Sequence, residues 1–224
     1  MDLTALALAL AYFGAAIGVV MVLPQILRIV RNPRLDGVSP WAWGMLTVAS
    51  SLWLTYGVRT GSLPQIPGNV LLVSGAVAIV LLVPTRWSRP RRAATLAGVV
   101  AALLAVSTLL APTQVGFLAF GIGLVGMWPQ VHETVWVRRG MGPSAISLTS
   151  QGLKVASQVC WWTFAVLTMD LPVLVGASMA LLTNGIVTSV ELARRRAAIG
   201  APDPVAMVSA SRAVAEPVRV PVAA

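Results

Sequence analysis

The stretch VSPWAWGMLTVASSLWLTYGV, residues 38–58, has a second, diverged copy in the same chain, ISLTSQGLKVASQVCWWTFAV, residues 146–166. The two stretches align without a gap at an offset of 108 positions. The pairs that keep their residue type include Ser39 and Ser147, Gly44 and Gly152, Trp53 and Trp161, and Thr55 and Thr163. Both copies are long and mostly apolar, so a duplicated helical unit decides the fold.

The composition places these helices in a lipid bilayer. The chain has 224 residues, of which 57% are hydrophobic and only 10% charged, and its mean hydropathy is +0.84. A soluble domain carries about 25% charged residues. The net charge of +9 is scattered in small clusters between apolar runs, which is a membrane-topology pattern and not a nucleic-acid-binding stripe. One Cys and one His allow no disulfide and no metal site, and no nucleophile–base pair indicates an enzyme.

Seven apolar segments are long enough to cross a bilayer, since a crossing helix needs about 20 residues. We expect no cleaved signal peptide, because no basic region precedes the first segment. Residues 197–224 are rich in Ala, Pro and Val and predict a disordered cytoplasmic tail. The predicted segments are 4–28, 40–58, 64–84, 93–111, 114–137, 144–168 and 171–192.

The arginines predict the orientation. They follow the first, third, fifth and seventh segments, whereas Arg59 alone falls on the opposite side. By the positive-inside rule the N-terminus lies outside and the C-terminus in the cytoplasm. Arginine fills 15 of the 16 basic positions, which suggests a GC-rich bacterial genome and therefore the plasma membrane.

Two copies that both place arginines after their first helix must run in the same direction. Three crossings reverse the side of the chain, so one further crossing has to join the copies, and the uncharged segment 93–111 supplies it. The predicted fold class is therefore all-α integral membrane, with two parallel three-helix repeats joined by a linker helix (3+1+3). The predicted division is 1–85, 86–113, 114–196 and the tail 197–224. Parallel repeats predict a cavity at their interface.

A proline–glutamine pair interrupts the first helix of each copy, as Pro24-Gln25 and as Pro129-Gln130, at an offset of 105 positions. A proline inside a helix cannot donate to the carbonyl four residues earlier. In hydrocarbon the freed carbonyl is tolerated where it lines a cavity or finds another donor. The paired position favours a hinge, and a static kink is the alternative.

The paired motifs LPQ (23–25) and WPQ (128–130) resemble the PQ-loop superfamily, and WLTYG (53–57) with Asn69 looks like its SWEET branch of sugar transporters. The resemblance implies hinge prolines, matched by Pro24, Pro40 and Pro129, with Leu148 in the fourth place. It also implies two Trp and two Asn around the solute and a homo-oligomer. The second Asn would fall at Ala177 or Ser178, with Asn184 further along. The complete candidate binding set is Ser51, Trp53, Asn69, Lys154, Gln158, Trp161, Trp162, Ser178 and Asn184.

The sixth segment carries a polar stripe. Ser147, Gln151, Lys154, Gln158 and Trp162 follow at spacings of three and four, which places them on one helix face. Such a face predicts an aqueous path. Lys154 lies ~15 Å into the bilayer, where a lysine costs at least ~2.5 kcal/mol. We expect it to contact an anionic or strongly polar solute, or to titrate during transport; a lysine that snorkels to the cytoplasm is the alternative.

The leading hypothesis is a transporter of a small polar solute, with a sugar favoured, that works by alternating access without a cofactor. One alternative is an anionic metabolite or amino acid recognised by Lys154, and another is a non-transporting receptor on the same fold. A retinal protein is disfavoured because no carboxylate is placed mid-membrane beside that lysine. The expected partners are the solute, the lipid bilayer and further copies of the chain, but no nucleic acid.

Overall fold

The computed structural model describes residues 2–21, 27, 31, 40–83, 85–144 and 147–200, which contain helices and no strand. The α-helices in this part of the chain are α1 (Leu3–Val20), α3 (Pro40–Thr60), α4 (Gln65–Leu82), α5 (Arg89–Ser107), α6 (Pro112–His132), α7 (Leu148–Thr168) and α8 (Leu171–Gly200). A π-helix, η1 (Glu133–Val137), extends α6. Each of the seven predicted segments corresponds to one of these helices.

Five helical segments in the described residues are long and apolar enough to cross a membrane: Leu3–Val20, Gln65–Leu82, Arg89–Ser107, Pro112–Val137 and Leu171–Ile199. The all-α membrane class is therefore confirmed. Helices α3 and α7 have 21 residues each but are more polar. Helix α7 carries Gln151, Lys154 and Gln158 of the stripe from which the sequence predicts an aqueous path.

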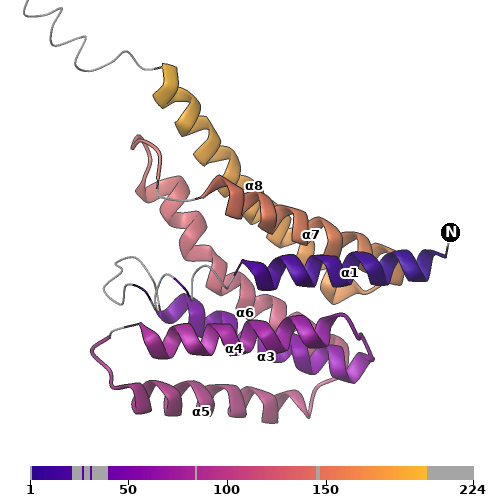
Figure 1. Ribbon diagram of the computed structural model, residues 1–224. Coiled ribbons are helices and arrows are strands. Elements are labelled where there is room, and N and C mark those ends of the chain that lie inside the picture. Colours follow the sequence, from indigo (N-terminus) through magenta and orange to yellow (C-terminus); the bar gives the residue numbers. More distant parts are fainter. Residues whose placement is uncertain are drawn as a thin grey trace, which may run out of the picture.

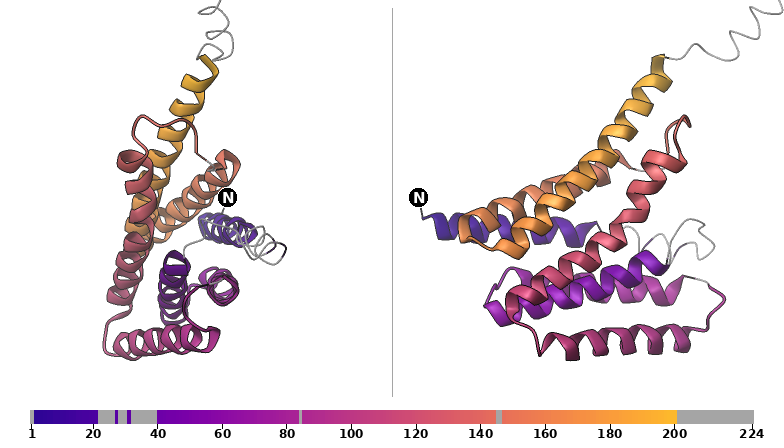
Figure 2. Two further views of the ribbon diagram at one scale, coloured as in Figure 1. Left: turned by 90° about the vertical axis from the view of Figure 1, so that its left-hand side faces the viewer. Right: turned by 180° about the vertical axis from the view of Figure 1, so that it is seen from behind.

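Six helices pack in a closed ring. The contacts run from α1 to α7, then to α8, α6, α3 and α4, and back to α1. Helix α5 lies outside the ring against α3 and α4, at the bottom of Figure 1. In the right-hand view of Figure 2, α6 and α8 run obliquely to α3, α4 and α5.

Two ends of the bundle are distinguished by the links between helices (Figure 1). We call the end that holds residue 2 and the links 61–64, 108–111 and 169–170 the N-terminal end. We call the opposite end, with residues 85–88 and 138–144, the arginine-rich end.

Three helix ends are closed by arginine side chains. The last carbonyls of a helix have no intrahelical donor and carry partial negative charge, so a guanidinium is a suitable partner. Arg59 donates to Ser107 O (2.7 Å) and Leu110 O (2.8 Å) at the end of α5. Arg92 caps α4 through the carbonyls of Val80, Leu81 and Val83, and Arg194 caps η1 through those of Thr134 and Arg138. These residues thus have structural roles besides any effect on orientation.

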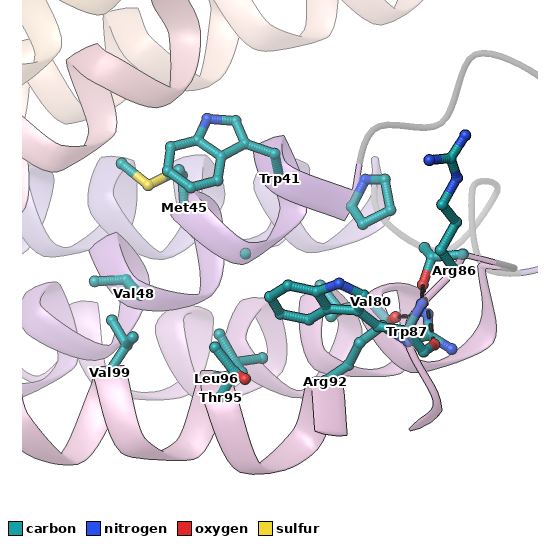
Figure 3. Close-up of a pocket in the computed structure, with 13 residues that line it drawn as sticks. Trp41, Met45, Val48, Val80, Arg86, Trp87, Arg92, Thr95, Leu96 and Val99 are labelled. Atoms are coloured by element: carbon teal, nitrogen blue, oxygen red, sulfur yellow. Dashed lines mark hydrogen bonds between the residues drawn. The ribbon is translucent and has the colours of Figure 1, made fainter. Parts of the chain in front are cut away.

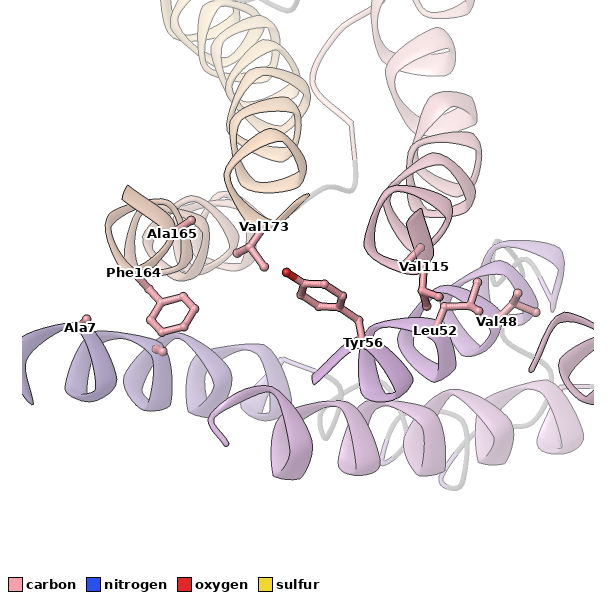
Figure 4. Packing of buried hydrophobic residues seen from close by; sticks show 10 residues of the cluster. Ala7, Val48, Leu52, Tyr56, Val115, Phe164, Ala165 and Val173 are labelled. Atoms are coloured by element: carbon pink, nitrogen blue, oxygen red, sulfur yellow. The ribbon is translucent and has the colours of Figure 1, made fainter. Parts of the chain in front are cut away.

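The buried core joins the ring near its N-terminal end (Figure 4). Its residues come from five helices: Ala7, Ala11, Val48, Leu52, Tyr56, Val115, Ala119, Phe164, Ala165 and Val173. Close helix approach depends on small residues, as is usual in membranes. A Cβ on Gly14 would lie 3.0 Å from Cys160 Cβ, and the hydroxyl of Ser157 donates to Gly14 O at 2.8 Å.

Two predicted boundaries are corrected. Helix α5 begins at Arg89 and not at residue 93, because Ser88 and Pro90 start the helix and Arg92 folds back onto α4. Helix α8 continues to Gly200, so residues 197–200 belong to a helix and not to a disordered tail. Residues 201–224 lie outside the described part of the chain.

Candidate functional site

Two aromatic pairs occupy equivalent places in the two copies of the repeated stretch. The rings of Trp53 and Tyr56 have centroids 5.7 Å apart at 82°, and those of Trp161 and Phe164 are 5.7 Å apart at 89°. Both members of the second pair follow the first by 108 positions. The structure thereby makes Trp161, and not Trp162, the counterpart of Trp53.

The two equivalent tryptophans both lie against the core. A Cβ on Gly176 of α8 would be 3.3 Å from the ring of Trp53, so this indole reaches from α3 across to α8. Trp161 lies against Gly14 of α1, with 3.3 Å from its Cδ1 to the corresponding position. Trp162 is 40% exposed, and its Nε1 donates to the hydroxyl of exposed Ser178 at 3.1 Å. The candidate set is therefore divided between two half-buried indoles, Trp53 and Trp161, and the more exposed pair Trp162 and Ser178.

The smaller polar candidates bond to their own helices. The Asn69 and Asn184 amides donate to the carbonyls of Gln65 and Ala180, both at 2.8 Å. The Ser51 hydroxyl is buried and donates to Thr47 O at 2.8 Å. The carbonyl oxygen of each amide remains an acceptor for a hydroxyl-rich ligand.

The polar stripe of α7 faces protein along most of its length. Gln151 is 2% exposed, and Lys154 and Gln158 are half-buried. Within the described residues, no hydrogen bond or ion pair joins Lys154 to another group. Ser147 begins the stripe as the N-cap of α7, with its hydroxyl accepting from Ser150 N at 3.2 Å. A half-buried ammonium without a bonded partner is suited to an anionic or strongly polar ligand.

A hydrogen bond that sequence reasoning missed closes the N-terminal end. The buried Tyr56 hydroxyl of α3 donates to Asp170 Oδ1 of the α7–α8 link at 2.7 Å. The same oxygen accepts from Val173 N at 3.2 Å and so also caps α8. A Cβ on Gly116 of α6 would lie 2.6 Å from Pro172 Cβ and 3.1 Å from Tyr56 Cδ2. The Tyr56 ring of α3 is thus packed against α6 and α8 (Figure 4).

This bond is formed once, although the turn around it is duplicated. Ser62 N donates to Gly57 O and Asp170 N donates to Ala165 O, both at 2.9 Å and offset by 108 positions. The positions equivalent to Tyr56 and Asp170 are Phe164 and Ser62, and a phenyl ring has no hydroxyl to donate. An acidic residue directly before the last apolar segment was the one sequence signal for this contact.

The second proline–glutamine pair lies one turn before a widened helical turn. Helix α6 continues through Pro129, and η1 begins at Glu133. The amide of Arg138 donates to Glu133 O at 3.0 Å, a π-type bond, and the Gln130 amide lies 3.3 Å from the hydroxyl of Thr134. The π-helix forms the C-terminal end of this helix, and π-turns in helices are frequent at functional sites.

The other hinge candidates differ in position. Pro40 is the first residue of α3, where a missing N–H leaves no helical bond unmade. Pro24 and Gln25 lie outside the described residues.

A buried carboxylate ties the second half together at the arginine-rich end. Glu191 of α8 is fully buried and accepts from Ser144 N (2.9 Å), the Ser144 hydroxyl (2.8 Å) and Arg195 Nε (3.2 Å). It thereby fixes the α6–α7 link against α8.

Comparison with known families finds a likeness in the first part of the chain. Residues 6–66 match the family model described as the PQ loop repeat. The match covers most of α1, the first proline–glutamine pair, α3 and the start of α4, and it supports the PQ-loop superfamily. No curated protein matches the sequence. Together with the five helical segments that are able to cross a membrane, the match indicates a multi-pass membrane protein.

Proposed function

We propose that this protein transports a small polar solute, with a sugar favoured, across the plasma membrane by alternating access. The observation that carries the proposal is the bond between Tyr56 and Asp170, which joins the first half of the chain to the second at the N-terminal end. At the other end, helix α6, which packs on α3 of the first half, contains Pro129 and continues into the π-helix η1. A closed end opposite a deformable helix is the arrangement that alternating access requires.

We also propose the architecture that such transport needs: repeats α1–α3–α4 and α6–α7–α8, with α5 as the linker helix. The packing supports it, because α1 packs on α7 just as its counterpart α6 packs on α3. Within each repeat, the first and third helices are in contact, and so are the second and third. The positive-inside rule puts the N-terminal end outside and the C-terminus in the cytoplasm.

In the proposed cycle, the N-terminal end, which we propose to face outside, is closed by the Tyr56–Asp170 bond. Opening that end requires the Tyr56–Asp170 bond to break so that α3 can leave the start of α8. The compensating closure at the arginine-rich end comes from bending of α6 near Pro129, where one helical bond is already missing. Pro24-Gln25 is proposed to do the same in the first repeat.

The residues along the ring fit a sugar in two respects. The indoles of Trp53 and Trp161 offer flat apolar faces from opposite repeats, and Asn69 and Asn184 offer amide groups to hydroxyls. A second candidate solute is an anionic metabolite or amino acid. Lys154 favours this class, because its half-buried ammonium has no described partner.

Uptake by the purified chain in proteoliposomes tests the proposal. Labelled sugars, sugar acids and amino acids are each offered with no gradient of any other solute. Saturable uptake of a neutral sugar supports the leading function. Saturable uptake of an acid that Lys154→Met abolishes supports the second candidate, and saturable uptake of none of the panel argues for a receptor.

The hinge has its own test, with a matched control on the same helix. Pro129→Ala restores the amide that the helix lacks and is expected to slow transport while membrane insertion is unchanged. Pro112→Ala changes a proline at the helix start, where the amide has no helical partner, and is expected to leave the rate unchanged. Equal rates for both variants would reduce the proline–glutamine pair to a static kink.

A further inference from the structure

A hollow of about 580 Å³ lies outside the ring, between α3, α4 and α5 (Figure 3). We call it the linker groove. Its walls include Trp41 and Met45 from α3, Leu96 and Val99 from α5, and Trp87 and Arg86 from the α4–α5 link. The groove is apolar along its length, and in Figure 3 the Arg86 side chain stands at one end of it.

The mouth of the groove is cationic. Arg86, Arg89 and Arg91 are exposed within six residues of each other, and the Arg91 guanidinium lies 4.5 Å above the ring of Trp87. Arg92 also lines the groove but is bonded to the carbonyls of α4. The sequence has no Asp or Glu between residues 37 and 132. Within the described residues no carboxylate pairs with the three exposed arginines, so their charge is available to an anion.

We propose that the linker groove binds one anionic phospholipid, with an acyl chain between α3 and α5 and the phosphate at Arg86, which lines the groove, and Arg91, which lies over Trp87. Basic pockets between membrane helices on the cytoplasmic side are suited to anionic headgroups. Tryptophans at the height of the headgroups, here Trp41 and Trp87, are typical of the membrane–water interface. The site rests on the membrane location of the chain and does not depend on what the chain transports.

The groove is a poor site for the transported solute. One of its walls is α5, which lies outside the ring of six helices. Its apolar walls offer few partners to a hydroxyl-rich molecule, which needs hydrogen bonds to replace those it makes with water. An acyl chain needs none.

Lipid binding to the purified full-length chain tests the proposal. The probes are phosphatidylglycerol and phosphatidylcholine with the same acyl chains, titrated in detergent and counted by native mass spectrometry. We expect one phosphatidylglycerol to bind more tightly than phosphatidylcholine by about 30-fold, from ~1 kcal/mol for each of two arginines. Equal binding of the two lipids overturns the proposal. So does full competition by inorganic phosphate, which would indicate an anion site without a lipid.

Binding of the acyl chain and binding of the headgroup are tested by separate variants. Gly44→Leu fills the groove, because a Cβ on Gly44 meets nothing within 4 Å, and is expected to abolish retention of the lipid. Gly98→Leu makes the same change at an equally open position outside the groove lining and should have no effect. Val99→Phe fills the groove from its other wall if Gly44→Leu is not recovered folded. Retention by both filled variants overturns the assignment.

For the headgroup, the double variant Arg86→Ala/Arg91→Ala is expected to lose the preference for phosphatidylglycerol. The control Arg139→Ala/Arg196→Ala removes the same charge from exposed positions at the same end and should retain it. Loss of the preference in both pairs would show a general charge effect and overturn the site. If the wild-type chain is a dimer and Gly44→Leu or Val99→Phe makes it monomeric, the groove is the contact surface for a second copy of the chain and not a lipid site.

Discussion

Tyr56→Phe removes one hydroxyl from the N-terminal end and leaves the ring that packs between α3, α6 and α8. The lost bond is short, at 2.7 Å, and its acceptor is a carboxylate. Hydrogen bonds to charged groups contribute about 1.5–3 kcal/mol. Because about 1.4 kcal/mol corresponds to a factor of ten, the ratio of closed to open N-terminal ends should fall about 10- to 150-fold.

Accessibility of a buried cysteine measures this ratio. The probe is Ala119→Cys in a Cys160→Ser background, since Ala119 is 0% exposed and belongs to the same core cluster as Tyr56. A membrane-impermeant thiol reagent added outside sealed vesicles reaches this position only when the end opens. If opening is fast compared with labelling, the labelling rate follows the open fraction and should rise by the same factor.

The other tyrosine of the chain provides the control. Tyr12 is 45% exposed on α1, so Tyr12→Phe removes a hydroxyl without affecting the closed end and should leave the labelling rate unchanged. Equal rates for Tyr56→Phe and Tyr12→Phe would refute the closing role of the bond. Faster labelling from the inside of the vesicles would instead refute the proposed orientation.

Three further substitutions have defined outcomes. Gly116→Ala forces its Cβ to 2.6 Å from Pro172 and should raise the same labelling rate and cost about 1–3 kcal/mol; Gly121→Ala, with open space around it, should do neither. Arg59→Met removes the guanidinium bonds at the end of α5 and should lower the free energy of unfolding by about 1 kcal/mol, read as a lower Tm in detergent. Glu191→Gln replaces an acceptor oxygen with an amide group that faces donors and should lower the free energy of unfolding by about 1–3 kcal/mol. An unchanged Tm in Arg59→Met or in Glu191→Gln would contradict the structural role of that residue.

Helices were predictable from the sequence because apolar length alone identifies them. Their ends were less so. The start of α5 contains Arg89 and Arg92, and a count of hydrophobic residues assigns such positions to a loop. The structure shows why they are helical, since the Arg92 side chain turns back to the carbonyls of α4. The last turns of α8 are polar for a different reason, because Glu191 and Arg194 bond to the α6–α7 link and to η1.

The candidate site was predictable where it follows the repeat and not where it depends on packing between distant helices. The offset of 108 positions identifies Trp161 as the partner of Trp53, yet the adjacent Trp162 fitted the stripe of α7 equally well. Only the contact of α7 with α1 separates them. The Tyr56–Asp170 bond joins residues 114 positions apart, and its counterpart in the repeat is absent. No periodicity in the sequence reports such a bond.

The single bond at the N-terminal end also bears on how a duplicated gene diverges. In a symmetric pair of identical halves, any contact across the axis occurs twice, and weakening it requires changes that act on both copies at once. In a single chain that constraint is absent, because Tyr56 and Phe164 are separate positions. A substitution at either position changes the energy of closure by a single hydrogen bond. Phe164→Tyr paired with Ser62→Asp would supply the donor and acceptor of a second bond at the equivalent positions, and the change in the strength of the closed state would then measure what one such bond contributes.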